Sequence, residues 1–159
     1  MSLENMITDR TERDVARVEA LAEKAWQDMT AEERTEWMSP MKGSYNYTDL
    51  NRVEEAVQYV AMRLKEYGYL SEEPVTRSWT VDDKPTEEDF VRHVRNMVMI
   101  RDASRAFREN TPDIPFFNVD HFGVADANAF EQILVDVDKF LDNMRDAWLF
   151  LNEPYSGEV

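Results

Sequence analysis

The fold is decided by residues 42–54, Lys42-Gly43-Ser44-Tyr45-Asn46-Tyr47-Thr48-Asp49-Leu50-Asn51-Arg52-Val53-Glu54, where a loop passes directly into an amphipathic helix. Gly43 permits a positive φ angle, which suits a turn. Either Asn46 or Thr48 can cap the helix that follows, and Gly68 is typical of the left-handed residue after a helix end. Apolar residues recur three and four positions apart, which is one face of a helix, at Leu50, Val53, Val57, Val60 and Leu64. The stretch predicts a helix from about Asp49 to Tyr67.

The same spacing of apolar residues predicts helices on both sides of this one. Three of them start at a threonine followed by acids, a pattern that satisfies the free amides of a first turn. These threonines are Thr11, Thr30 and Thr86. The predicted helices run from about Glu12 to Asp28, from Thr30 to a stop at Ser39-Pro40, from Thr86 to about Arg108, and from about Asp126 to Leu151.

Residues 74–81 break this pattern, because Pro74-Val75-Thr76-Arg77-Ser78-Trp79-Thr80-Val81 alternates weakly and contains residues that favour strands. The segment reads either as a single strand or as a packed loop. The chain has no second good strand pattern beside it, so we favour an ordered extended segment with Trp79 held on the helices. The predicted fold class is mainly all-α, a bundle of about four to five helices with one extended segment near residues 74–81.

Length and composition indicate a single folded domain. A chain of 159 residues with 43% hydrophobic residues can bury a core without a disulfide or metal. We expect residues 1–8 to be disordered or derived from a tag, residues 9–151 to form one helical domain, and residues 152–159 to be a mobile tail. The chain has no cysteine, which excludes a disulfide scaffold, a thiolate metal site and a cysteine nucleophile.

The formal net charge of −15 argues against binding to nucleic acid or to an anionic membrane surface. Arginines are interleaved with acids and form no basic stripe. No apolar run approaches the length of a membrane span, and the N-terminus does not resemble a signal peptide. The sequence therefore predicts no secretion by a signal peptide.

Catalytic and metal-binding signatures do not emerge from the sequence. His93 and His121 are too isolated for a metal site, and each reads as a surface or half-buried histidine. Asp138 and Asp142 share a helix face but read as a solvated pair. We therefore predict no catalytic residue, no cofactor and no metal.

Two groups of residues are candidates for contact with a partner. Tyrosine and arginine commonly anchor interfaces, which singles out Tyr45, Tyr47 and Arg52. The alternative is that these residues cap and start a helix. The second group is the aromatic loop with Phe116, Phe117 and Phe122, which could equally fold back onto the bundle.

Several phrases of this chain resemble a family of small proteins encoded among the tail genes of phages and prophages of gut Firmicutes. The phrases are Asp9-Arg10-Thr11, the stretch from Lys42 to Val53, Asp83-Lys84-Pro85-Thr86 after Trp79, Ala127-Asn128, Ile133-Leu134-Val135-Asp136-Val137, and Tyr155-Ser156-Gly157-Glu158. Glu153-Pro154 before Tyr155 departs from the family pattern. The resemblance implies a virion or tail-associated role and a location in the virion or the bacterial cytoplasm, and it carries no activity or ligand.

The leading hypothesis is a non-enzymatic phage or prophage tail protein that acts by protein–protein contact. Its partners would be other virion or phage proteins, and repeated copies make a homo-oligomer an expectation. The alternative is an acidic regulator or inhibitor that binds a bacterial protein, including by DNA mimicry. A more remote alternative is a small hydrolase that depends on carboxylates.

Overall fold

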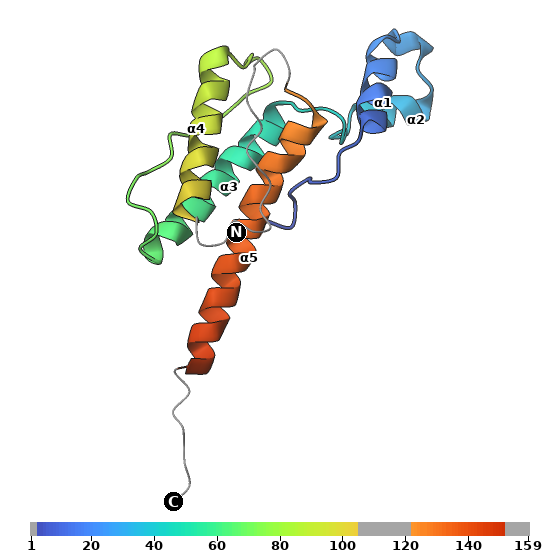
Figure 1. The fold of residues 1–159 in the computed structure, drawn as a ribbon. Coiled ribbons are helices and arrows are strands. Elements are labelled where there is room, and N and C mark those ends of the chain that lie inside the picture. Colours follow the sequence, from blue (N-terminus) through green and yellow to red (C-terminus); the bar gives the residue numbers. More distant parts are fainter. Residues whose placement is uncertain (1–2, 105–121, 152–159) are drawn as a thin grey trace, which may run out of the picture.

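The computed structural model describes residues 3–104 and 122–151, with side chains up to residue 147. Its described part is an all-α bundle without strands, as the sequence predicts (Figure 1). The helices are α1 (Glu12–Ala22), α2 (Ala31–Trp37), α3 (Tyr47–Glu66), α4 (Glu87–Ala103) and α5 (Val124–Leu151), with a 3₁₀ turn at Trp26–Asp28.

Three helices, α3, α4 and α5, form the core and pack against one another. The apolar stripes predicted from the sequence supply its side chains, because positions three and four apart share one face of a helix. The fully or almost fully buried members include Val53, Val57, Val60, Leu64, Met97, Ile100, Phe130, Ile133, Leu134, Val137 and Leu141. The C-terminal part of α5 extends past the other two helices (Figure 1).

The predicted starts of α1, α2 and α4 are confirmed, and the open choice of cap at α3 is resolved, so that α3 begins at Tyr47, two residues before the predicted Asp49. Asn46 is the cap, because its Oδ1 accepts from the Thr48 amide at 2.9 Å and the Asp49 carboxylate accepts from the Asn46 amide at 3.1 Å. Thr11, Thr30 and Thr86 cap α1, α2 and α4 with the same reciprocal arrangement. The end of α3 is also as predicted, with Gly68 at a φ of 76°.

Three further helix boundaries differ from the prediction. The first helix ends at Ala22 and not near Asp28, because the chain turns at Trp26–Asp28 to bring α2 back against α1. Helix α4 ends at Ala103, and the residues predicted to continue it, 105–108, lie outside the described part. Helix α5 starts at Val124, two residues early, where the Asp126 carboxylate accepts from the Gly123 amide.

Helices α1 and α2 form an arm that stands beside the bundle (Figure 1). Leu21 and Met29 are its buried apolar residues. An ion pair from Arg17 to Glu36 joins the two helices, and Lys24, just after the end of α1, pairs with Glu33 of α2, at 2.6 Å each. Gly43 holds the arm to the loop before α3. Contrary to the expectation from the sequence, the φ of Gly43 is not positive. Instead, a Cβ atom there would lie 2.1 Å from the carbonyl oxygen of Asp14.

The segment between α3 and α4 is a packed loop and not a strand, and asparagine side chains satisfy part of its backbone. The Asn96 amide accepts from the Val75 N–H at 3.1 Å and donates to the Val75 carbonyl at 2.8 Å. Asn51 binds the N–H and C=O of Trp79 in the same way, at 2.8 and 2.9 Å. The Trp79 side chain is buried, so the predicted position of Trp79 on the helices is confirmed.

Asn96→Asp tests this mode of holding the loop. The change replaces a donor with a charged oxygen that faces the Val75 carbonyl, in a side chain that is almost fully buried. We expect the free energy of unfolding in urea to fall by about 2–3 kcal/mol. The matched control is Asn143→Asp, at an exposed position of α5. Equal losses of unfolding free energy in the two variants would refute the proposed role of Asn96.

The N-terminal segment also packs on the bundle. Leu3 is 8% exposed and belongs to the core cluster, and the Ile7 amide donates to Glu131 on α5. Residues 3–8 therefore contribute to the fold of the described chain, although we had expected residues 1–8 to be disordered or derived from a tag. A tag origin stays a prediction, as does the mobile tail at 152–159, which lies outside the described residues.

Candidate functional site

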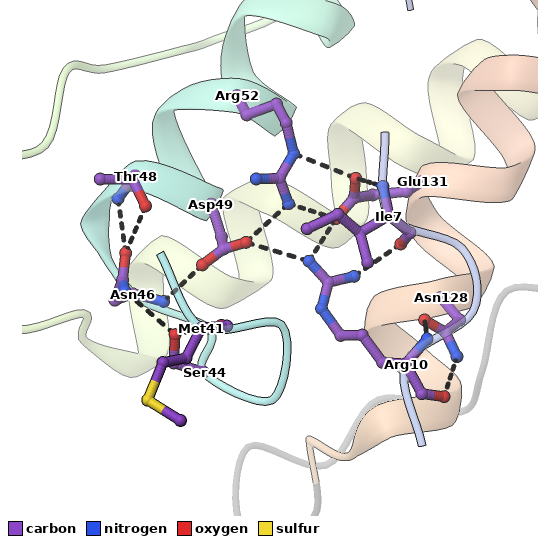
Figure 2. Close-up of polar contacts among 10 residues, drawn as sticks. All are labelled: Ile7, Arg10, Met41, Ser44, Asn46, Thr48, Asp49, Arg52, Asn128 and Glu131. Carbon is purple, nitrogen blue, oxygen red and sulfur yellow. Dashed lines mark hydrogen bonds and ion pairs between the residues drawn. The ribbon is translucent and has the colours of Figure 1, made fainter. Parts of the chain in front are cut away.

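Four charged side chains from three parts of the chain meet at the end of the bundle nearest the arm. They are Arg10, Asp49, Arg52 and Glu131 (Figure 2). Glu131 is fully buried and accepts four hydrogen bonds: from Arg10 Nη2 at 2.7 Å, from Arg52 Nη2 and Nε at 2.8 and 3.2 Å, and from the Ile7 amide at 2.6 Å. Asp49 bridges the two guanidinium groups, at 3.0 Å from Arg10 and 2.6 Å from Arg52.

The network holds the N-terminal segment against α5 through both its side chains and its backbone. Arg10 Nη1 donates to the Ile7 carbonyl at 2.6 Å. The Asn128 amide accepts from the Arg10 N–H at 3.0 Å and donates to the Arg10 carbonyl at 2.9 Å. Asn128 thus binds a backbone residue as Asn51 and Asn96 do, and each of the three core helices carries one such asparagine.

Charge balance explains how this network tolerates burial. Two arginines face two carboxylates, and a buried ion pair is sustainable only when its charges and hydrogen bonds are matched. Burial acts to lower the pKa of Arg52, but hydrogen bonds to Glu131 and Asp49 outweigh it and raise that pKa. Burial, followed by the charge of Glu131, raises the pKa of Tyr45, whose ring packs beneath Arg10. These groups fix three chain segments in place.

A second buried cluster lies between α3, α4 and the connecting loop. Glu54 Oε1 lies 2.7 Å from Arg92 Nη1, 3.4 Å from Trp79 Nε1 and 3.9 Å from His93 Nδ1. We predicted His93 to be a surface or half-buried histidine, and this was wrong: the residue is 3% exposed. The helical position that we read as polar faces the core, where the His93 ring packs on Phe130. His121 lies outside the described residues.

His93 should make stability depend on pH. Burial, and then the charge of Arg92, lowers the pKa of His93 to about 4. The unfolded chain therefore binds a proton more readily, so the contribution of His93 is complete above pH 6.5 and is lost as the pH falls toward 4. Burial raises the pKa of Glu54, whose contribution has the opposite sign. We expect the fall in the free energy of unfolding between pH 8 and pH 5 to be about 2 kcal/mol smaller in His93→Gln than in the wild type.

Urea unfolding of both proteins at the two pH values measures this difference. Both proteins keep Glu54, so its contribution is present in each of them. The prediction concerns the change with pH and is independent of how stable the variant is at pH 8. Equal pH dependence in wild type and His93→Gln would contradict it.

The structure separates the predicted interaction residues. Tyr45 packs against Phe122, with ring centroids 4.9 Å apart, and Arg52 lies in the charged network. Both are engaged inside the molecule. Tyr47, the first residue of α3, is 39% exposed and has the access that an anchor needs. Phe122 packs also on Phe90 and Phe130, whereas Phe116 and Phe117 lie outside the described residues. That any of them contacts a partner stays a prediction.

Two exposed tryptophans of the arm, and the exposed Met38 next to one of them, were missed by sequence reasoning. Trp26 is 53% exposed, Trp37 38% and Met38 75%. We had read Trp26 as part of the apolar stripe of the first predicted helix, and Trp37 and Met38 only as residues of the short helix that follows it. The turn at Trp26–Asp28 removes Trp26 from that face, and Arg34 holds it by donating to the Trp26 carbonyl at 3.0 Å while its guanidinium lies 5.4 Å from the indole ring. Tryptophan is among the residues that most often dominate binding energy.

The network residues Arg10 and Glu131 were also missed as a site. Glu131 left a signal, because several residues one turn away on its helix, Ala127, Leu134 and Val135, are apolar. Arg10 left none beyond its place in a resembling phrase. Asp138 and Asp142, read as a solvated pair, instead bind Arg63 of α3 from α5.

No family model, curated protein or solved structure matches this chain. In the described part of the chain, no group of three or more histidine, aspartate or glutamate side chains is arranged to hold a metal ion. None of the described helices is long and apolar enough to cross a membrane.

Proposed function

We propose that this protein is a non-enzymatic component of a phage or prophage tail, or an assembly factor for one, and that it acts by contacting other phage proteins. The observation that carries the proposal is the arm, which holds two exposed tryptophans and Met38 apart from the core of the protein. The resembling phrases from Asp9 to Glu158 supply the tail context.

The arm has the character of a contact surface. A helical pair this small buries little apolar area of its own, yet ion pairs and an arginine that holds Trp26 give it a defined shape. Keeping bulky aromatic groups in water is unfavourable unless they meet a partner. Residues 12–39 contain eight acidic and four basic residues, so a complementary partner surface would be apolar with a basic rim.

The deciding experiment is mass spectrometry of virions purified from an induced lysogen that carries the gene, together with tail-assembly intermediates from the same lysate. We expect peptides of this protein in the virion or in the intermediates. Its absence from both, with known tail proteins detected, would refute the proposal. In a lysogen encoding Trp26→Ala and Trp37→Ala together, we expect at least a tenfold loss of the protein from these particles, while its level in the lysate is unchanged.

The DNA-mimicry alternative has less support. It requires rows of free carboxylates spaced like phosphates, whereas many surface acids are paired with arginines, as at Arg17, Arg77 and Arg145.

A further inference from the structure

The outer face of α4 carries two exposed valines and two opposite charges at regular spacing. Glu88, Val91, Arg95 and Val98 follow one another at intervals of three, four and three residues, which places them on one face of the helix. Val91 is 46% exposed and Val98 40%, and Glu88 and Arg95 are exposed as well. Alternating intervals of three and four form the seam between two paired helices. Helix α4 lies on the opposite side of the bundle from the arm (Figure 1).

The two charges of this face are available to a partner. Neither Glu88 nor Arg95 makes an ion pair with a described residue. The arginine one turn from Glu88, Arg92, is held by Glu54 at 2.7 Å. Glu88 and Arg95 are too far apart to neutralise each other, because seven residues separate them by about 10.5 Å along the helix axis. The face therefore presents a negative charge and a positive charge, with Val91 between them.

This arrangement is complementary to itself when two copies pair with their α4 helices antiparallel. In a two-fold contact, the same surface of both copies is used, and each pair of facing residues occurs twice. With the axis next to Val91, Arg95 of each copy lies opposite Glu88 of the other copy. A parallel pair would instead bring the two Glu88 side chains together. A depression of about 360 Å³ at this point has room for Val91 of the second copy, and it is lined by Glu87, Glu88, Val91, Arg92 and Arg95.

The charge of this region also favours a second copy as the occupant. With a net charge of −15, two copies of the chain repel each other over most of their surface. Residues 84–98 are balanced, because they contain three acidic and three basic residues. The arm, at residues 12–39, contains eight acidic and four basic residues, so contact between two arms is opposed by repulsion. The outer face of α4 is therefore better suited to self-association than the arm is.

We propose that two copies of this chain associate through an antiparallel pair of α4 helices, with Val91 at the two-fold axis and ion pairs between Arg95 and Glu88 on both sides of it. A contact of this size gives a weak dimer in solution. Repeated copies held in one assembly reach effective concentrations of about 1 mM, at which a weak contact forms.

The inference goes beyond the proposed function, because self-association through α4 does not require a tail. Absence of the protein from virions would overturn the tail role and leave the dimer intact. A protein that stays monomeric would overturn the dimer and leave the tail role intact.

Sedimentation velocity of the full-length protein, over a concentration series up to about 1 mM, measures the dissociation constant of the dimer. We expect the wild type to dimerise as its concentration rises. Glu88→Arg and Arg95→Glu each set like charges against each other on both sides of the axis, because the two-fold symmetry repeats every change. Each variant alone should dimerise at least tenfold more weakly than the wild type.

The two variants in combination give the decisive result. In an equal mixture of Glu88→Arg and Arg95→Glu, one copy is positive at both positions and the other is negative at both. A mixed dimer therefore regains both ion pairs, and we expect its dissociation constant to lie within threefold of the wild-type value. The double variant Glu88→Arg with Arg95→Glu keeps the net charge of −15, and we expect it to dimerise as the mixture does.

The matched control is Lys139→Glu, which makes the same change in net charge as Arg95→Glu at an exposed position of α5. Its dissociation constant should lie within twofold of the wild-type value, and circular dichroism confirms that each variant is folded. A wild type that stays monomeric at about 1 mM would overturn the proposal. The same conclusion follows if Arg95→Glu dimerises as well as Lys139→Glu, or if neither the mixture nor the double variant recovers dimerisation.

Discussion

Glu131→Gln should lower the free energy of unfolding by about 3–5 kcal/mol, the usual cost of removing one partner from a buried ion pair. The reason is the arrangement in Figure 2: Glu131 is fully buried and binds Arg10 and Arg52 together. With glutamine, one carboxylate, Asp49, remains for two guanidinium groups, and the new amide donors face other donors. Urea denaturation measured at neutral pH tests the size of the effect.

Two further variants distinguish charge imbalance from simple loss of contacts. Asp146→Asn, an exposed neutralisation on the same helix, should change stability by less than about 0.5 kcal/mol. The double variant Arg10→Met with Glu131→Leu leaves one arginine facing one carboxylate. It should be less destabilised than the sum of its single variants, because groups in one network are not additive. A fully additive double variant would show that charge balance is not what holds the network.

Gly43→Ala should destabilise the protein by about 3 kcal/mol and loosen the arm. The added Cβ would lie 2.1 Å from the Asp14 carbonyl oxygen and 2.5 Å from the Val15 nitrogen. Both atoms belong to the backbone of α1, so no side chain can move aside, and the effect falls at the upper end of the range for overpacking. Urea denaturation measures the loss, and faster amide hydrogen exchange in α1 than in α3 would report the loosened arm.

Gly68→Ala is the informative comparison, because that position has open space but a positive φ of 76°. The substitution should cost about 1–2 kcal/mol through backbone conformation alone, without faster exchange in α1. If Gly43→Ala costs no more than Gly68→Ala and leaves exchange in α1 unchanged, the close approach of Gly43 to α1 does not secure the arm.

Much of the bundle could be predicted because its signals are local. The stripe from Leu50 to Leu64 and the cap boxes at Thr11, Thr30 and Thr86 involve residues within a few positions of one another, so the sequence itself shows them. The first helix was predicted too long for the same reason. Val15 to Met29 keeps the spacing of one stripe, and the turn at Trp26–Asp28 arises from packing against α2, which that spacing does not record.

The charged network and the loop contacts could not be predicted, because their partners are distant in sequence. Glu131 meets Arg10 across 121 positions, and Asn96 meets Val75 across 21. An isolated asparagine or glutamate looks like any polar residue until the fold shows which backbone or charge it faces. The same limit explains His93, which reads as polar but lies against Phe130.

The sequence by itself determined an acidic, cysteine-free helical chain, the starts of its helices to within about two residues, and the apolar stripe that each core helix buries. These properties follow from composition and from periodicities of a few residues. Only the tertiary structure decided the use of the stretch from Lys42 to Glu54. Gly43 serves close packing and not a positive φ, Tyr45 and Arg52 lie inside the molecule, and two exposed tryptophans lie on the arm. The physical reason is that burial, charge pairing and close approach are properties of three-dimensional neighbours, which no local pattern contains.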